Sequence, residues 1–214
     1  MKWNVKKMVL VAMLAAVAYI MVFLIRIPVV LFLSYEPKDV IITIGGFLLG
    51  PGAAFVCSLV VSLVEMVSIS ETGIIGCVMN LLSTCSFACT AAVIYKKRHD
   101  LTGAILGLIT GSLLMAGVMI LWNWLVTPLY MGVAREAVEE LLLPTFLPFN
   151  LLKAGFNSAL TLLLYKPVVT ALRRTGLVEG TSSSARGSKW GVYLLSGILL
   201  VTCVLLLLAL QGKI

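Results

Sequence analysis

The chain has 214 residues, of which 61 % are apolar and 12 % are charged. A soluble domain is typically about half apolar and about one quarter charged, so this composition excludes a soluble globular protein and indicates an integral membrane protein. The formal net charge of +7 does not indicate nucleic acid binding, because the basic residues cluster beside the hydrophobic segments.

Hydrophobic segments follow one another along the whole chain, and a membrane-spanning helix needs roughly 20 mostly apolar residues. We expect helices at about residues 8–25, 39–50, 52–69, 74–95, 101–126, 145–168 and 190–210. The first segment has no signal-peptide cleavage site and is expected to remain in the protein. The second and third are interpreted as two helices joined by a tight turn at Gly50, Pro51 and Gly52. The alternative is one long kinked helix.

The first segment carries Ala12 and Ala16, which are four residues apart and therefore share one helix face. Small residues at this spacing allow a second helix to approach closely in lipid. The alternative is that alanine is simply common in membrane helices.

Two connections on the outer side are unusual. Residues 26–39 are too apolar for a solvated loop and too irregular for a span, so we expect them to pack on protein or to line a cavity. Residues 127–148 contain the amphipathic sequence AREAVEELLL, which predicts a short surface helix over the outer face.

Basic residues set the predicted orientation, because they are enriched on the cytoplasmic side of membrane proteins. With the amino terminus cytoplasmic, that side receives Lys2, Lys6, Lys7, Lys96, Lys97, Arg98, Lys166, Arg173, Arg174, Arg186 and Lys189. The outer side receives Arg26, Lys38, Arg135 and Lys213.

The end of the chain differs in composition from the rest. Residues 175–189 are polar and rich in Ser and Gly, which is typical of a flexible linker. We therefore expect a six-helix membrane domain (1–174), a cytoplasmic linker (175–189) and an additional, lipid-facing transmembrane helix (190–214).

Three polar residues interrupt the hydrophobic segment at 145–168. Asn150, Lys153 and Asn157 have the spacing i, i+3 and i+7 and share one helix face. An ionisable residue inside the membrane is costly and by default faces the bundle interior, where it marks a functional site. Two alternatives remain: Lys153 extends to the outer headgroups, and Asn157 forms a structural hydrogen bond between helices.

Other segments supply polar groups at the same outer level, namely Glu36, Asp39, Glu65, Asn80 and Asn123. Apolar walls with a few placed polar groups are the usual composition of a ligand pocket. The tryptophans on either side of Asn123 either belong to this pocket or form an interfacial belt. The sequence thus predicts a small-molecule site near the outer face.

Motifs of energy-using and catalytic proteins are missing from the sequence. There is no GxxxxGK[ST] phosphate loop, no HExxH and no GxSxG, so we expect no nucleotide hydrolysis and no other enzymatic activity. The five cysteines lie in hydrophobic segments without a CxxC pair and are interpreted as small apolar residues. With a single histidine, His99, we expect no metal site and no cofactor.

Four motifs together resemble one family. YEPKDVIITIGGFLLGPGAA (35–54), ETGIIGCVMNLLS (71–83), NWLVTPLYMG (123–132) and LPFNLLKAGFNSAL (147–160) are similar to the riboflavin-binding S components, of the RibU type, of energy-coupling factor (ECF) transporters. The resemblance covers about residues 5–170. It implies an all-α bundle of six transmembrane helices in a bacterial cell membrane, with the vitamin bound near the outer face under the connection after the first helix.

The resemblance also implies roles for individual site residues. Asn150 and Lys153 match the polar pair that holds the flavin, and Asn123 matches the amide of the fifth helix. Glu36 and its neighbours match the covering loop, and Asn80 matches less closely. The chemistry is reasonable, because an amide both donates and accepts hydrogen bonds at the uracil-like edge of riboflavin, whereas lysine only donates.

Partners follow from the same resemblance. Ala12 and Ala16 match the AxxxA motif on which the transmembrane T component docks. Two ATPases would supply the energy, which explains the missing phosphate loop. The seventh segment departs from the six of the family and places the carboxyl terminus outside. From the residues alone, two other functions stay open: an S component for a different vitamin, and a membrane structural or regulatory protein without a small ligand.

Overall fold

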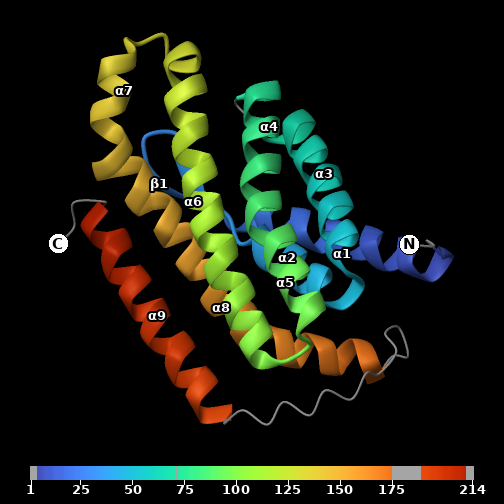
Figure 1. The fold of residues 1–214 in the computed structure, drawn as a ribbon. Helices are drawn as coiled ribbons and strands as arrows, with labels where there is room; N and C mark the ends of the chain where they lie inside the picture. Colours follow the sequence, from blue (N-terminus) through green and yellow to red (C-terminus); the bar gives the residue numbers. More distant parts are fainter. Residues whose placement is uncertain (1–3, 71, 175–188, 211–214) are drawn as a thin grey trace.

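The computed structural model describes residues 4–70, 72–174 and 189–210, which form a helical bundle with one small hairpin (Figure 1). In chain order the elements are α1 (Val5–Leu24), β1 (Ile27–Val30), β2 (Leu33–Tyr35), α2 (Lys38–Leu49), α3 (Pro51–Ser68), α4 (Gly73–Thr84), the π-helix η1 (Cys85–Cys89), α5 (Thr90–Lys97), α6 (Leu101–Met131), α7 (Arg135–Leu141), the π-helix η2 (Leu142–Phe146), α8 (Leu147–Arg174) and α9 (Lys189–Leu210). For these residues the predicted all-α class is confirmed, apart from the hairpin.

Four stretches of the described chain are long and apolar enough to cross a membrane: α1, α3, the continuous stretch α4–η1–α5, and α6. They confirm four of the predicted spans. The predicted span at 39–50 is too short, because α2 has 12 residues and rises only about 18 Å against a hydrocarbon core of about 30 Å. The additional helix predicted at 190–210 is present as α9, whereas the linker before it lies outside the described residues.

Sequence signals fix where several helices begin and end. Asn4 caps α1 by accepting a hydrogen bond from the backbone N–H of Lys7 at 2.9 Å, and Asp100 caps α6 in the same way. Between α2 and α3, Gly50 has a φ of 91° and Pro51 is the first residue of α3, so the helix cannot continue through this point. The predicted turn is confirmed, and the single kinked helix is excluded.

The connection over 26–39 contains an antiparallel hairpin of β1 and β2, with Ile27 opposite Tyr35. Its turn places Leu31 in the left-handed region with a φ of 51°. One face of the hairpin packs on α7, η2 and α8 in a cluster of buried residues that we call the hairpin cluster: Val29, Leu33, Tyr35, Val138, Phe146 and Phe149. The prediction that this connection packs on protein is confirmed, although strands were not expected.

The connection over 127–148 is helical almost throughout. α6 has 31 residues and extends beyond its predicted end at 126 to Met131, where Gly132 closes it with a left-handed φ of 66°. α7 is the predicted short surface helix, and it continues through η2 into α8. Pro144 lies within η2. Proline has no backbone N–H to donate, and the wider π turn tolerates this missing hydrogen bond.

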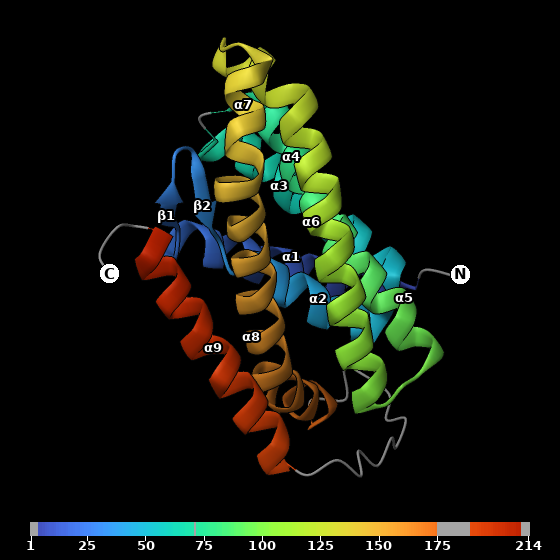
Figure 2. The same ribbon diagram turned by 60° about the vertical axis from the view of Figure 1, so that its left-hand side comes forward.

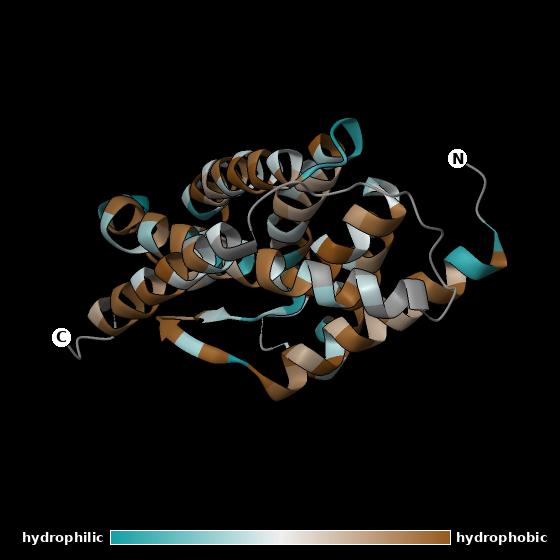
Figure 3. Ribbon diagram, turned by 90° about the horizontal axis from the view of Figure 1, so that it is seen from below, coloured by the Kyte–Doolittle hydropathy of each residue, from teal (hydrophilic) through white to brown (hydrophobic). Residues whose placement is uncertain are grey.

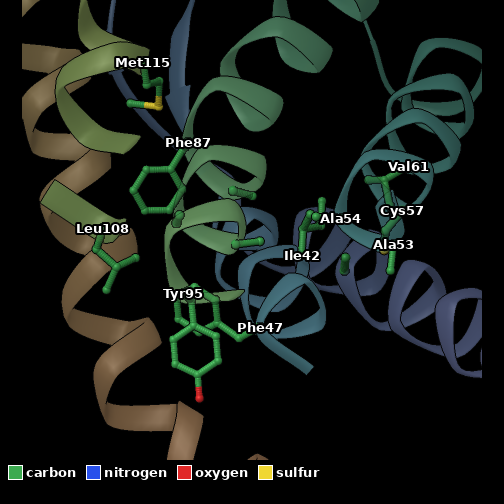
Figure 4. Packing of buried hydrophobic residues seen from close by; sticks show 14 of the residues in the cluster. Ile42, Phe47, Ala53, Ala54, Cys57, Val61, Phe87, Tyr95, Leu108 and Met115 are labelled. Atoms are coloured by element: carbon green, nitrogen blue, oxygen red, sulfur yellow. The ribbon is translucent and has the colours of Figure 1, made fainter. Parts of the chain in front are cut away.

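Glycines bring α6 very close to the segment before it. A methyl group added at Gly107 would lie 2.7 Å from the carbonyl oxygen of Ala91, and one at Gly111 would lie 2.6 Å from that of Phe87. Both distances are too short for a real side chain, so only glycine permits this approach. Figure 4 shows Phe87 and Met115 in the core beside this contact.

α9 lies along α8 with the opposite chain direction (Figure 2). Cys203 is buried, and a methyl group added at Gly155 of α8 would lie 2.6 Å from its Sγ. Leu207 packs on the hairpin cluster. Other side chains of α9, such as Val201 and Leu194, are apolar and exposed, as expected for a surface in contact with lipid. Figure 3 shows hydrophobic residues over most of the helices and hydrophilic ones at the start of α1.

Candidate ligand-binding site

A cavity of about 60 Å³ lies between the hairpin, α3, α4, α6 and α8. Its charged and amide lining residues are Arg26, Glu36, Glu65, Asn80, Asn150 and Lys153, and its apolar walls include Phe32, Leu33, Met79, Met119 and Phe149. Four of the seven predicted ligand residues, Glu36, Asn80, Asn150 and Lys153, thus line one space. The other three, Asp39, Asn123 and Asn157, are fully buried and do not line it.

A lysine that the sequence analysis counted only as an outer charge lies at the centre of this region. The Lys38 ammonium lies 2.8 Å from Oε2 of Glu36 and 2.5 Å from Oε2 of Glu65. The Lys38 side chain is only 1 % exposed, so both ion pairs are shielded from water. Arg26 adds a contact of 3.4 Å to Glu36, and Asn80 donates a hydrogen bond of 3.0 Å to Glu65.

These contacts change the acidity of Glu36, which lies between β2 and α2. Burial alone would raise the pKa of its carboxyl group, since burial disfavours the charged form. The positive charges of Lys38, Lys153 and Arg26 outweigh this effect and hold the pKa below its usual value. Glu36 therefore remains a carboxylate that accepts hydrogen bonds.

A second set of contacts surrounds the Asp39 carboxylate, behind the cavity wall. Thr84 donates a hydrogen bond of 2.6 Å to Oδ1, and Asn157 donates one of 3.1 Å to Oδ2. The Lys153 ammonium lies 3.5 Å from the same Oδ2. Tyr35 of the hairpin donates to Oδ1 of Asn157 at 3.2 Å. Of the two roles considered for Asn157, the structure shows the hydrogen bond between helices.

The two remaining asparagines each use an amide N–H on their own helix. Asn150 donates to the carbonyl oxygen of Phe146 at 2.7 Å, while it also lines the cavity. Asn123 donates to the carbonyl oxygen of Met119 at 2.7 Å and accepts from Thr127 at 2.8 Å. Asn150 is therefore placed to present its Oδ1 to a ligand, whereas Asn123 is engaged within α6.

The tryptophans beside Asn123 do not contribute to the cavity lining. Trp124 donates a hydrogen bond of 2.8 Å to Glu139 of α7 and lies under the guanidinium of Arg135 at 5.0 Å from the ring centroid. This residue therefore connects α6 to the surface helix, away from the cavity.

Sequence reasoning missed the roles of Lys38, Arg26, Tyr35 and Thr84. One signal could have identified Lys38: the carboxylates Glu36 and Glu65 were both expected at the outer level of the bundle, and buried carboxylates require a cation. Tyr35 and Thr84 carry no such signal, because hydroxyl groups are common in helices and strands of every kind.

A second, larger hollow lies between α1 and α3. This groove measures about 650 Å³, and its lining includes Ala12, Ala15 and Ala16 of α1 and Val56, Val60 and Val64 of α3. Ala12 and Ala16 are exposed, and the lining is almost entirely apolar. Tyr19 also lines the groove, and its hydroxyl donates a hydrogen bond of 2.8 Å to Ser68; the other lining residues are apolar, which favours contact with another helix or with lipid.

The chain is similar to known proteins in sequence and in fold. Residues 6–165 match the family model "ECF transporter, substrate-specific component". The riboflavin transporter RibU of Staphylococcus aureus (strain TCH60) is 29 % identical over an alignment of 178 residues, which covers 79 % of this chain and 93 % of the relative. A solved structure described as "Structure and mechanism of the S component of a bacterial ECF transporter" matches with a TM-score of 0.66 at 28 % identity, covering 79 % of this chain and 98 % of that one. The family match ends before α9.

Proposed function

The chain belongs to the family of substrate-specific (S) components of ECF transporters, and on that premise we propose that its substrate is riboflavin. S components are non-catalytic, multi-pass membrane subunits that work with a T component and ATPases. In this proposal the protein binds riboflavin near the outer face of a bacterial cell membrane. It then delivers the vitamin across the membrane with one T component and two ATPases.

The observation that carries the proposal is the pairing of Asn150 and Lys153 on one wall of the cavity. The uracil-like edge of riboflavin has one N–H between two carbonyl groups, which an amide and an ammonium group complement. The carboxylate of Glu36, which also lines the cavity, would accept hydrogen bonds from the ribityl hydroxyls. Phe149 and Met119 supply apolar surface for the flat ring system. The name of the staphylococcal relative supports the same substrate.

The charges around the cavity favour a ligand without net charge. Three cations, Arg26, Lys38 and Lys153, each lie within 3.5 Å of a carboxylate of Glu36, Glu65 or Asp39. A phosphate group would add nearly two negative charges and would compete with these carboxylates for the same cations. We therefore expect riboflavin to bind more tightly than its phosphorylated form.

The small size of the cavity supports a binding mechanism in which the protein moves to admit the ligand. A space of about 60 Å³ is several-fold smaller than the roughly 300–1,000 Å³ of pockets that hold drug-sized ligands. Phe32 and Leu33 of the hairpin region form part of its lining. Moving the hairpin outward is the simplest way to enlarge it, so the hairpin acts as the cover of the site.

The groove between α1 and α3 is proposed as the docking face for the T component. Its exposed alanines, Ala12 and Ala16, allow a partner helix to approach closely. The groove is separate from the polar cavity, so docking and binding use different surfaces. The basic residues Lys6, Lys7, Lys96 and Lys97 support an amino terminus on the cytoplasmic side.

Purification from cells grown with riboflavin tests the proposal directly. The purified protein should be yellow, and the ligand-free protein should quench riboflavin fluorescence on titration. Asn150→Leu and Lys153→Met should each weaken binding by about 10- to 100-fold, because an unpaired buried polar group costs about 1–3 kcal/mol.

The control is Thr110→Val in α6, where an exposed hydroxyl donates to the carbonyl oxygen of Leu106 on the same helix, and it should bind like the parent. A colourless protein that leaves riboflavin fluorescence unchanged would exclude riboflavin. If that protein instead bound another vitamin, the S-component assignment would stand with a different substrate.

A further inference from the structure

Asp39 lies close to the cavity but does not line it. It is completely buried, and it is not among the residues that line the cavity. Lys153 does line the cavity, with its ammonium 3.5 Å from Asp39 Oδ2. A carboxylate in this place contacts the residue that faces the ligand rather than the ligand itself.

We infer that Asp39 is a positioning residue that holds the Lys153 ammonium at the cavity wall. This inference rests on the proposed function, because it assigns Lys153 to the ligand. It differs from the role predicted from the sequence, in which Asp39 belonged to the group of ligand-contacting residues.

The distribution of ion pairs among the described residues supports the assignment. Glu36 has its ion-pair contacts with Lys38 and Arg26, and Glu65 contacts Lys38 and Asn80. Lys153 also acts on Glu36 through its charge, but its ion-pair contact in the described chain is with Asp39. Lysine carries its charge on a flexible four-carbon stem, so a fixed partner is needed to keep the ammonium in one place.

The carboxylate of Asp39 is itself held firmly. Thr84 of α4 donates to Oδ1, and Asn157 of α8 donates to Oδ2, so neither oxygen is free to rotate away. Tyr35 donates to Oδ1 of Asn157, which turns the amide N–H₂ group of that side chain towards Asp39.

These contacts connect the hairpin to the Lys153 ammonium through Asn157 and Asp39. Burial raises the pKa of Tyr35, and the nearby charge of Asp39 raises it further, so the hydroxyl remains protonated and able to donate. Because Tyr35 belongs to β2, the seated hairpin contributes to the orientation of Asn157, then of Asp39, and finally of Lys153. Movement of the hairpin would loosen Lys153 at the same time.

A double-mutant cycle tests the inference. Asp39→Asn keeps the size of the side chain and removes its charge, and should weaken riboflavin binding by about 10-fold or more. The double variant Asp39→Asn/Lys153→Met should bind within about twofold of Lys153→Met alone, because the two residues act as one unit. The charge near the flavin also affects its electronic structure, so both single variants should shift the absorption bands of bound riboflavin in the same direction.

Two further variants separate positioning from general damage. Thr84→Val removes one hydrogen bond to the Asp39 carboxylate and should give a smaller loss of affinity with the same spectral shift. If Asp39→Asn does not fold, Thr84→Val tests the positioning role in its place. Thr43→Val is the matched control, because the Thr43 hydroxyl donates to the backbone oxygen of Asp39 rather than to its carboxylate, and it should bind like the parent.

The outcomes distinguish the inference from the proposed function. Additive losses of affinity, or weaker binding without a spectral shift in both Asp39→Asn and Thr84→Val, would overturn the positioning role while riboflavin binding by the parent stands. A parent that binds no riboflavin would overturn the proposed function. In that case the same cycle of Asp39 and Lys153 variants is measured by melting temperature without ligand, and additive shifts there would also overturn the inference.

Discussion

The ammonium of Lys38 lies 2.5 Å from Oε2 of Glu65, and both side chains are almost completely buried. This pair connects the start of α2, which follows the hairpin, to the carboxyl-terminal end of α3. Breaking such a pair by removing one partner leaves an uncompensated charge in a region of low dielectric constant.

We predict that Lys38→Met lowers the free energy of unfolding by about 3–5 kcal/mol, because Glu36 and Glu65 then face each other without a cation. Thermal unfolding in detergent measures the effect. The double variant Lys38→Met/Glu65→Gln should recover part of the lost free energy of unfolding, since it neutralises one of the two carboxylates left without Lys38. An unchanged melting temperature for Lys38→Met would show that the ion pair does not contribute to the stability of the fold.

The Glu36 carboxyl predicts a dependence of stability on pH. Its pKa in the folded protein lies below the usual value of 4.5, so the folded state favours the carboxylate. The resulting stabilisation is complete above the pKa of the unfolded chain and is lost as the pH falls through the lower pKa of the folded state. The melting temperature of the parent should therefore exceed that of Glu36→Gln near neutral pH, and the two should converge in acid. Glu140→Gln, at an exposed position on α7, serves as the control, and a difference that grows on acidification would contradict the prediction.

If the groove between α1 and α3 is the docking face, a variant that fills it should lose the T component and still bind riboflavin. Ala12→Trp/Ala16→Trp fills the groove with two indole rings, so the T component should no longer copurify, while riboflavin binding stays within about twofold of the parent. Met13→Trp is the matched control, because Met13 is exposed on the same helix but does not line the groove. A double variant that still copurifies with the T component and supports uptake would place the docking face elsewhere.

The close contact between Gly155 of α8 and Cys203 of α9 should hold the two helices together. In Gly155→Leu the new side chain occupies the position of Cys203 Sγ, which lies only 2.6 Å from the first added carbon, so α9 should be displaced. Cys203 should then react with a membrane-permeable maleimide, as detected by mass spectrometry of the labelled peptide. The control is Gly197→Leu, where an added carbon meets no atom within 4 Å. If Cys203 stayed as unreactive as in the parent, the contact with Gly155 would not be what holds α9 in place.

The part of the site on α8 was predictable because helical periodicity is a local property. The spacing of Asn150 and Lys153 placed both on one face, and the cost of a charge in the membrane turned that face inward. The structure shows both on the cavity wall. The separation of α2 from α3 was predictable for a similar reason, because Gly50 and Pro51 act on the backbone directly.

The hairpin and the Lys38 contacts could not be predicted in the same way. Strands of four and three residues are too short to show alternation, and they form here because Val29 and Leu33 find apolar partners on distant helices. Lys38 was assigned to the outer side by charge counting alone, whereas its burial depends on Glu65, which lies 27 positions later. The roles of Glu36 and Asn123 toward a ligand stay predictions, because each depends on a bound geometry.

Gly107 and Gly111 also bear on how the protein is made. The elements that they bring together, α6 and the stretch η1–α5, are neighbours in the chain, so their contact requires the closure of only a very short loop. Such sequence-local contacts form early, and this pair of helices can assemble during synthesis, before α8 has left the ribosome. A bulky residue at Gly111 would then act first on insertion and quality control. The cell would contain fewer copies of the protein, while the copies that mature would bind their substrate normally.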